Sequence, residues 1–247
     1  DYDKVRQQHA NKNHPPLWPL AQARANRTAI DWTTFTPTPP RALGRRVFKN
    51  FDLNELVPYM DWGPFFQTWD LAGPYPAILK DEVVGEEATR VFADGQAMLK
   101  KMIDGRWLQA SGVMALYPAN SVGDDIEFYT DETRSEVLTT WYGLRQQTEK
   151  HAVDGPNGEK VMRPSRCLAD FVAPKDSGIA DYAGLFAVTA GLGVEKKEKF
   201  FLDDLDYYSA IMFKSLADRL AEAFAECLHQ RVRTDLWGYA HDEKLSN

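Results

Sequence analysis

The chain has 247 residues, 44% hydrophobic and 26% charged, which are ordinary values for one large or two small globular domains. Its formal net charge of −7 argues against nucleic acid as a partner, because phosphate binding needs a basic stripe. No apolar run approaches the roughly 20 residues that span a bilayer, and two cysteines, Cys167 and Cys227, do not make a disulfide framework. We therefore expect a reduced, cytoplasmic protein with no membrane partner.

The first 17 residues are polar and contain a Pro-Pro pair, which is typical of a tail or linker. We assign residues 1–30 to this connecting segment, with a short helix at 20–27, and residues 31–247 to one domain. Strands are predicted at 45–51, 111–119, 126–130, 136–144 and 181–191, helices at 53–56, 62–71 and 83–105, and a loop at 154–160. Strands joined by short turns, with helices before and after them, favour an α+β fold with a twisted antiparallel sheet flanked by helices.

The longest predicted element is a C-terminal helix from Asp203 to about Trp237, because no Pro or Gly occurs before Gly238. Such a helix would be about 50 Å long. Its apolar stripe has three- and four-residue spacing and consists of Leu205, Tyr208, Met212, Leu216, Leu220, Ala223 and Cys227. This stripe predicts a helix packed against the core.

Another face of the same helix carries an acidic row, formed by Asp218, Glu222, Glu226 and His229, with Ala217, Ala221 and Ala225 beside it. Small residues next to carboxylates would let a partner or a ligand come close to the helix. The row supports two interpretations. It is either a solvated acidic face, as charge rows usually are, or the wall of a cleft that binds a cation.

Asp61 also supports two interpretations. An Asp just before a helix that has Pro in its first turn is a common N-cap. Alternatively, its carboxylate faces a cleft walled by aromatic residues, which would suit a ligand carrying an ammonium and a sulfonium group. The candidate wall residues are Trp62, Phe65, Phe66 and Trp69, which could equally belong to the core. The two roles of Asp61 can coexist, because one oxygen can cap while the other binds.

The sequence contains no pattern typical of a metal site, a phosphate loop or an activated nucleophile. The five histidines never pair with a cysteine at metal-ligand spacing, and the Gly191-Leu-Gly193 sequence lacks the third glycine of a dinucleotide-binding loop. We therefore expect no catalytic side chain and no metal in this chain.

A family resemblance is carried by long phrases between about Asp31 and Asn247. They are VPYMDWGPFFQTWDLAGPYPAILKDEVVGEEA, PANSVGDDIEFY, LRQQTEK, CLADFVAPKDSGIADYAGLFAVTAGL and LADRLAEAFAECLHQRVRTDLWGYA, with the later LSN. In this order they resemble the activation domain of cobalamin-dependent methionine synthase. The resemblance implies S-adenosylmethionine binding and support of the reductive remethylation of cob(II)alamin in methionine biosynthesis. The chain would then be a fragment of a methyltransferase, 5-methyltetrahydrofolate–homocysteine methyltransferase.

The resemblance also implies roles for three acids. Asp61 matches an Asp that contacts the amino group of S-adenosylmethionine, and Glu222 matches a Glu that faces the same site. Asp218 matches an Asp that interacts with the cobalt-ligand histidine of the neighbouring cobalamin domain, after that histidine has left cobalt. A carboxylate stabilises an imidazolium, so this role is physically sound. The alternative for the two helix acids is a solvated side chain, which Arg219 could partly neutralise.

By the same resemblance, the cofactors are S-adenosylmethionine and a cobalamin held by a neighbouring domain, and zinc belongs to another domain of the enzyme. The implied partners are that cobalamin-binding domain, which residues 1–30 would follow, and flavodoxin or a flavoprotein reductase. The family's domain continues past Asn247 with an Arg-Pro-Ala-Pro-Gly-Tyr phrase that holds the rest of the ligand. We therefore expect a C-terminally truncated domain that is inactive alone and binds S-adenosylmethionine weakly or not at all, which micromolar binding in calorimetry would contradict.

Two other classes of function stay open at this point. The chain could be a stand-alone or split docking module for a cobalamin protein, with no chemistry of its own, and co-purification with a cobalamin-binding chain would favour this. It could also be a structural domain that kept the scaffold but lost ligand binding. Replacing Asp61 by Asn separates ligand binding from helix capping.

Overall fold

The computed structural model describes residues 2–10, 16–155 and 157–244, so the LSN phrase and His14 lie outside the described residues. The chain forms two compact units, one from residues 1–39 and 117–183 and the other from residues 40–116 and 184–247. The α-helices are α1 (Tyr2–Ala10), α2 (Leu20–Ala25), α3 (Gly63–Gln67), α4 (Gly85–Asp104), α5 (Val194–Asp203) and α6 (Tyr207–Arg231). The strands are β1 (Gly44–Phe51), β2 (Gln109–Val122), β3 (Asp125–Tyr129), β4 (Val137–Trp141), β5 (Ala152–Asp154), β6 (Lys160–Met162) and β7 (Asp181–Leu192). Shorter helical turns are η1 (Leu53–Glu55), η2 (Val57–Tyr59), η3 (Ala77–Lys80), η4 (Leu168–Phe171), η5 (Lys175–Ser177) and the π-helical η6 (Val232–Leu236).

Strand β2 is the central strand of a five-stranded sheet. Its first half pairs antiparallel with β1, from Gly44↔Leu116 to Phe51↔Ala110, and its second half pairs antiparallel with β3. Strand β4 pairs with β3, and β7 pairs with β2. A two-residue turn joins β2 to β3, and Gly123 adopts φ +64 there, a conformation that favours glycine. The predicted α+β fold with an antiparallel sheet is confirmed.

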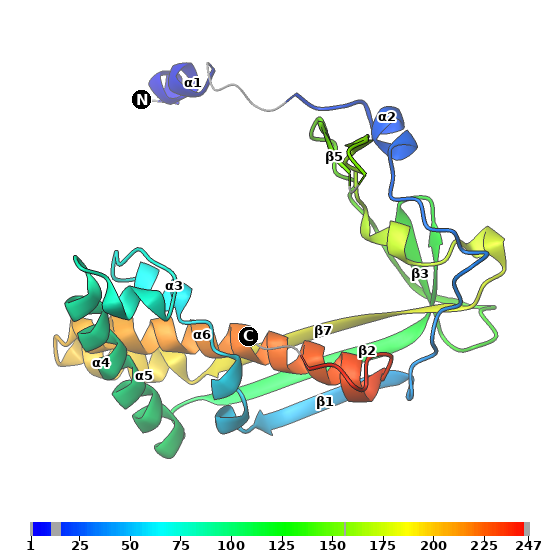
Figure 1. Cartoon of the computed structure of the whole chain (residues 1–247). Coiled ribbons are helices and arrows are strands. Elements are labelled where there is room, and N and C mark those ends of the chain that lie inside the picture. The colour runs from blue at the N-terminus through cyan, green and yellow to red at the C-terminus, as the bar shows by residue number, and fades with distance from the viewer. Residues whose placement is uncertain (1, 11–15, 156, 245–247) are drawn as a thin grey trace. The chain divides into compact units, whose positions relative to one another are not determined.

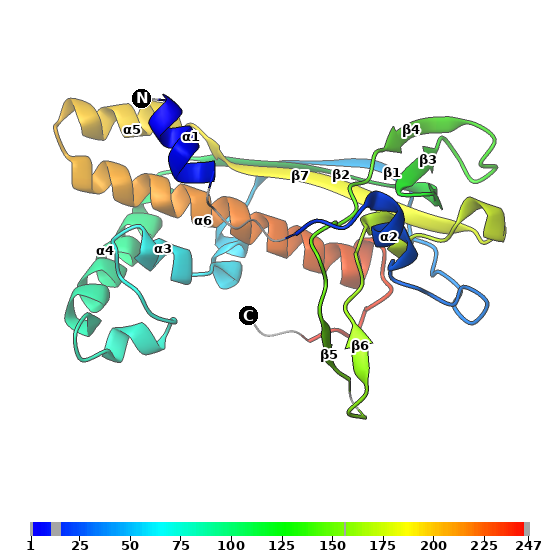
Figure 2. The same cartoon turned by 90° about the horizontal axis from the view of Figure 1, so that it is seen from above.

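In the second unit, α6 packs along the sheet (Figure 1), and the view turned by 90° shows the same arrangement (Figure 2). Alternate residues of β2 are buried, as period-two packing of one sheet face requires. A Cβ on Gly112 would lie 3.1 Å from the ring of Phe224, so this glycine allows α6 to approach the sheet closely. The residues of α6 that are buried are Ala210, Met212, Phe213, Leu216, Ala217, Leu220, Ala223, Phe224, Cys227 and Leu228.

The long predicted helix is correct for its middle and end but wrong at its start. The chain from Asp203 is not continuous helix, because Leu205 adopts φ +57 and separates α5 from α6. Asp206 then caps α6, its Oδ1 accepting a hydrogen bond from the Ser209 N–H at 3.0 Å. As a result Leu205 is 71% exposed and lies outside the apolar stripe, which is buried from Met212 onward.

One further prediction needs correction, and another is refined. The helix predicted at 62–71 is only the five-residue α3, because the chain turns at Asp70, where φ is +56. The loop predicted at 154–160 connects the two strands of a hairpin, in which Ala152↔Met162 and Asp154↔Lys160 pair, so only its two end residues belong to β5 and β6. Each of these strands has three residues, which is too short for alternation to be visible in the sequence.

The segment after residue 15 is bonded into the first unit. Trp18 N donates to the Gln147 carbonyl at 2.7 Å, and Asn26 Nδ2 donates to the Arg163 carbonyl at 2.9 Å. The short helix predicted at 20–27 is present as α2. The assignment of residues 1–30 to a connecting segment stays a prediction.

Arg145 is the centre of a buried ion cluster in the first unit. Its side chain is 1% exposed and donates to Asp124 at 2.8 Å, to Asp170 at 2.6 Å and to the Ser165 carbonyl at 2.7 Å. Arg24 also donates to Asp124, at 2.8 Å. The cluster therefore ties together four segments that lie far apart in the sequence.

None of the helices in the described part of the chain is long and apolar enough to cross a membrane.

Candidate functional site

The candidate site lies where the segment around Asp61 follows α6 in the second unit. At one end of the segment, the Tyr59 hydroxyl donates to Gln230 Oε1. At the other end, the Thr68 and Ser215 hydroxyls are hydrogen-bonded at 3.2 Å. The segment therefore runs antiparallel to α6, and Asp61 lies on the stretch between the two contacts.

Glu222 lies between the same two contacts on the helix. It follows Ser215 by seven residues and precedes Gln230 by eight, and two turns of α-helix take about 7.2 residues. The three residues thus share one side of α6. Glu222 therefore lies on the stretch of α6 that the Asp61 segment follows, although among the described residues no printed contact joins the two side chains.

The Asp61 carboxylate is exposed and uses one oxygen locally. Its Oδ1 accepts a hydrogen bond from the Gly63 N–H at 2.8 Å, at the first residue of α3. In the part of the chain that the structure describes, its Oδ2 accepts no hydrogen bond. The geometry is therefore compatible with one oxygen that caps and a second that is available to a ligand.

Asp61 also lines an open groove with a volume of about 660 Å³. The described residues that line this groove are Asp61, Gly63, Pro64, Gln67, Asp70, Leu71, Ala72, Gly73 and Pro74, and none of them is basic. Asp70 was not identified from the sequence, although its Asp-Leu-Ala-Gly-Pro phrase is rich in turn residues. Two carboxylates and no counter-cation make this groove suited to a positively charged group. Glu222 is not among its lining residues.

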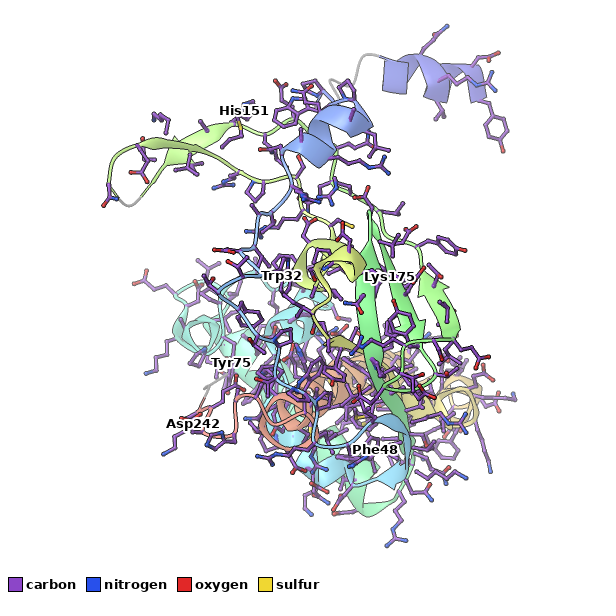
Figure 3. The ribbon with its side chains drawn as sticks, turned by 90° about the vertical axis from the view of Figure 1, so that its right-hand side faces the viewer. Trp32, Phe48, Tyr75, His151, Lys175 and Asp242 are labelled. Atoms are coloured by element: carbon purple, nitrogen blue, oxygen red, sulfur yellow. The ribbon has the colours of Figure 1, made fainter. Side chains whose placement is uncertain are left out.

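The aromatic residues near Asp61 belong to the core and do not wall the groove. Phe65 and Phe66 are fully buried, and Trp62 packs edge-on against Phe65, with ring centroids 5.2 Å apart. Tyr75, labelled in Figure 3, stacks on Phe66 at 6.2 Å. The core interpretation therefore holds for Trp62, Phe65 and Phe66, and none of the four candidate rings is among the described residues that line the groove.

The acids of α6 differ in their partners. Glu222 is exposed and makes no ion pair with any residue that the structure describes. The Asp218 side chain is 68% exposed and accepts a hydrogen bond from Arg219 at 2.5 Å, as the solvated-acid interpretation expects. Arg219 is only 12% exposed and lies mostly beneath the surface. The Asp218 carboxylate therefore stays open to solvent despite this hydrogen bond.

Among the described residues, no group of three His, Cys, Asp or Glu side chains could hold a metal ion. The fold and the site together define an α+β domain with an acidic side that can accept a cation.

Comparison with known proteins identifies the family. Residues 52–247 match the family described as "Vitamin B12 dependent methionine synthase, activation domain". A crystal structure described as the MetH reactivation domain bound to AdoHcy is 51% identical to this chain, with a TM-score of 0.84, and the match covers 94% of this chain and 68% of that chain. The chain belongs to the family of vitamin B12-dependent methionine synthase activation domains. The roles of Asp61, Glu222 and Asp218 stay predictions.

Proposed function

We propose that this chain binds S-adenosylmethionine and thereby supports the reductive remethylation of cob(II)alamin in a methionine synthase. The proposal is supported by the two contacts that hold the Asp61 segment along α6, because Glu222 falls between their helix partners Ser215 and Gln230. The related structure is described as bound to AdoHcy, the product that S-adenosylmethionine becomes when it gives up its methyl group.

The chemistry of the two acids fits this ligand. S-adenosylmethionine carries an ammonium and a sulfonium group, and both favour nearby carboxylates. Asp61 Oδ2 and the Glu222 carboxylate have no partner in the described part of the chain, so binding would not have to break an existing ion pair. Bound S-adenosylmethionine supplies the methyl group, and this chain binds and orients it.

Asp218 has a separate proposed role, at the contact with the cobalamin-binding domain. Its exposed carboxylate can accept a hydrogen bond from an imidazolium of that domain. The electron donor proposed for the whole enzyme is flavodoxin or a flavoprotein reductase. The docking-module alternative keeps this domain contact but needs no ligand at Asp61.

We expect Asp61→Asn in the full-length enzyme to raise the KM for S-adenosylmethionine by about 10- to 100-fold, because a hydrogen bond to a charged group contributes about 1.5–3 kcal/mol. The measurement is a reductive methylation assay over a range of S-adenosylmethionine concentrations. Glu222→Gln should act in the same direction.

The matched control is Asp52→Asn. Asp52 Oδ1 accepts a hydrogen bond from the Asn54 N–H at 2.9 Å, which is the same local contact as that between Asp61 and Gly63, but it does not line the Asp61 groove. The control variant should behave like the wild type. A normal KM for Asp61→Asn would show that Asp61 only caps α3, and the ligand-binding proposal would fail.

A further inference from the structure

Four contacts hold the segment that carries Asp61 against α6. Glu55 pairs with Arg231 and Tyr59 with Gln230 at one end. At the other end, Thr68 is hydrogen-bonded to Ser215, and the Trp69 ring packs against Tyr208 at 4.8 Å. The segment is thus fixed at both ends, whereas the Asp61 side chain has its hydrogen bond only within the segment.

The α6 partners in three of these contacts repeat with the helix. Tyr208, Ser215 and Gln230 are separated by seven and fifteen residues, about two and four turns, and Glu222 falls in the same series. These three contacts therefore lie on one side of α6, and Glu222 lies on the same side. The distance along the helix from Ser215 to Gln230 is about 22 Å.

We propose that Tyr59 and Ser215 are positioning residues, which fix the Asp61 segment along α6 so that its carboxylate and that of Glu222 meet the same ligand. This inference rests on the proposed function and extends it to residues that need not touch S-adenosylmethionine. The Tyr59 hydroxyl suits the role because it donates to Gln230 Oε1, and burial raises its pKa further above neutral.

The physical basis is preorganisation. The buried rings of Phe65 and Phe66 hold the segment to the core, and the two polar contacts set its position along α6. Binding then has fewer positions of the Asp61 carboxylate to restrict when the ligand arrives. Loss of either contact should weaken binding through Asp61 and leave the rest of the site intact.

The test is a double-mutant cycle on the full-length enzyme with Tyr59→Phe and Asp61→Asn, with S-adenosylmethionine binding measured by equilibrium dialysis. Tyr59→Phe alone should weaken binding by about 3- to 10-fold, as expected for the loss of one neutral hydrogen bond. In the Asp61→Asn background it should have no further effect. Ser215→Ala should repeat this pattern, and Tyr142→Phe, which removes a hydroxyl from a 77% exposed side chain, should change nothing.

A second readout needs no ligand. Hydrogen exchange of residues 59–68, followed by mass spectrometry, should be about 3- to 10-fold faster in Tyr59→Phe. Unchanged exchange, or an equal loss of binding in both Asp61 backgrounds, would overturn the positioning role while leaving the proposed function in place. If Asp61→Asn itself binds normally, the proposed function fails, and the positioning role fails with it.

Discussion

Replacing Arg145 by alanine should lower the free energy of unfolding of the first unit by about 3–5 kcal/mol, because it leaves two buried carboxylates without their shared cation. Asp170 is 3% exposed and Asp124 is 10% exposed, so both carboxylates are largely shielded from bulk solvent. Burial by itself would raise the pKa of both carboxyls. The hydrogen bonds from Arg145, with Arg24 at Asp124 and backbone N–H groups at Asp170, outweigh burial and hold both pKa values below the usual range.

The free energy of unfolding is measured by urea denaturation. Hydrogen exchange of peptides from residues 117–183 then shows whether the loss of stability lies in the first unit. The matched control is Arg166→Ala, an exposed arginine of the same unit, which should change stability by less than about 0.5 kcal/mol. Equal stability of the Arg145 variant and this control would show that the cluster contributes nothing.

The pH dependence of stability should reverse in the Arg145→Met variant. In the wild type, carboxyls with depressed pKa values stabilise the fold above about pH 4, and this contribution is lost as the pH falls further. Without Arg145, burial dominates and the folded state binds protons more strongly than the unfolded state. The free energy of unfolding of the variant should therefore rise as the pH is lowered from 7 to 5. Over the same range, the contribution of this cluster to the stability of the wild type stays constant.

The second large effect is expected at Phe65, the buried residue of α3 that holds the Asp61 segment to the core. Phe65→Ala should lower the free energy of unfolding by about 3–5 kcal/mol, because the ring is fully buried. The ring lies against Gly95 of α4, where an added Cβ would be 2.7 Å from Phe65 Cζ. Gly95→Ala should therefore also be destabilising, by about 1–3 kcal/mol, although alanine is normally the better helix former.

The two changes should compensate each other. With Phe65→Ala in place, the methyl group of Gly95→Ala enters vacated space, so the second change should stabilise by about 1 kcal/mol. Thermal and urea unfolding of both single variants and the double variant measure this coupling. Gln96→Ala, an exposed change on the same helix, is the control. Additive effects would mean that Gly95 and Phe65 do not share this contact.

Periodicity and turn residues were sufficient for much of the fold. The strand predicted at 45–51 is β1, and the helix predicted at 83–105 is α4, which ends at Gly105 as predicted. The break before α6 could not be located, because Asp203, Asp204 and Asp206 are all suitable caps and nothing local selects Asp206. Nor does the sequence indicate that Leu205 takes a left-handed conformation, since that conformation is uncommon for leucine.

The site was predictable only in part. The acidic row was visible because helical spacing is local, and Asp61 was reached through the family resemblance. The contacts around them were not predictable, because Tyr59 and Gln230 are 171 residues apart in the sequence. The aromatic residues beside Asp61 were ambiguous, since ring residues near a short helix fit a ligand cleft and a core equally well.

The spacing of contacts along α6 limits where the chain can change in length. One residue inserted between Ser215 and Gln230 would turn every later side chain by about 100° and carry Gln230 away from Tyr59. Insertions and deletions among natural relatives should therefore be rare between Ser215 and Gln230.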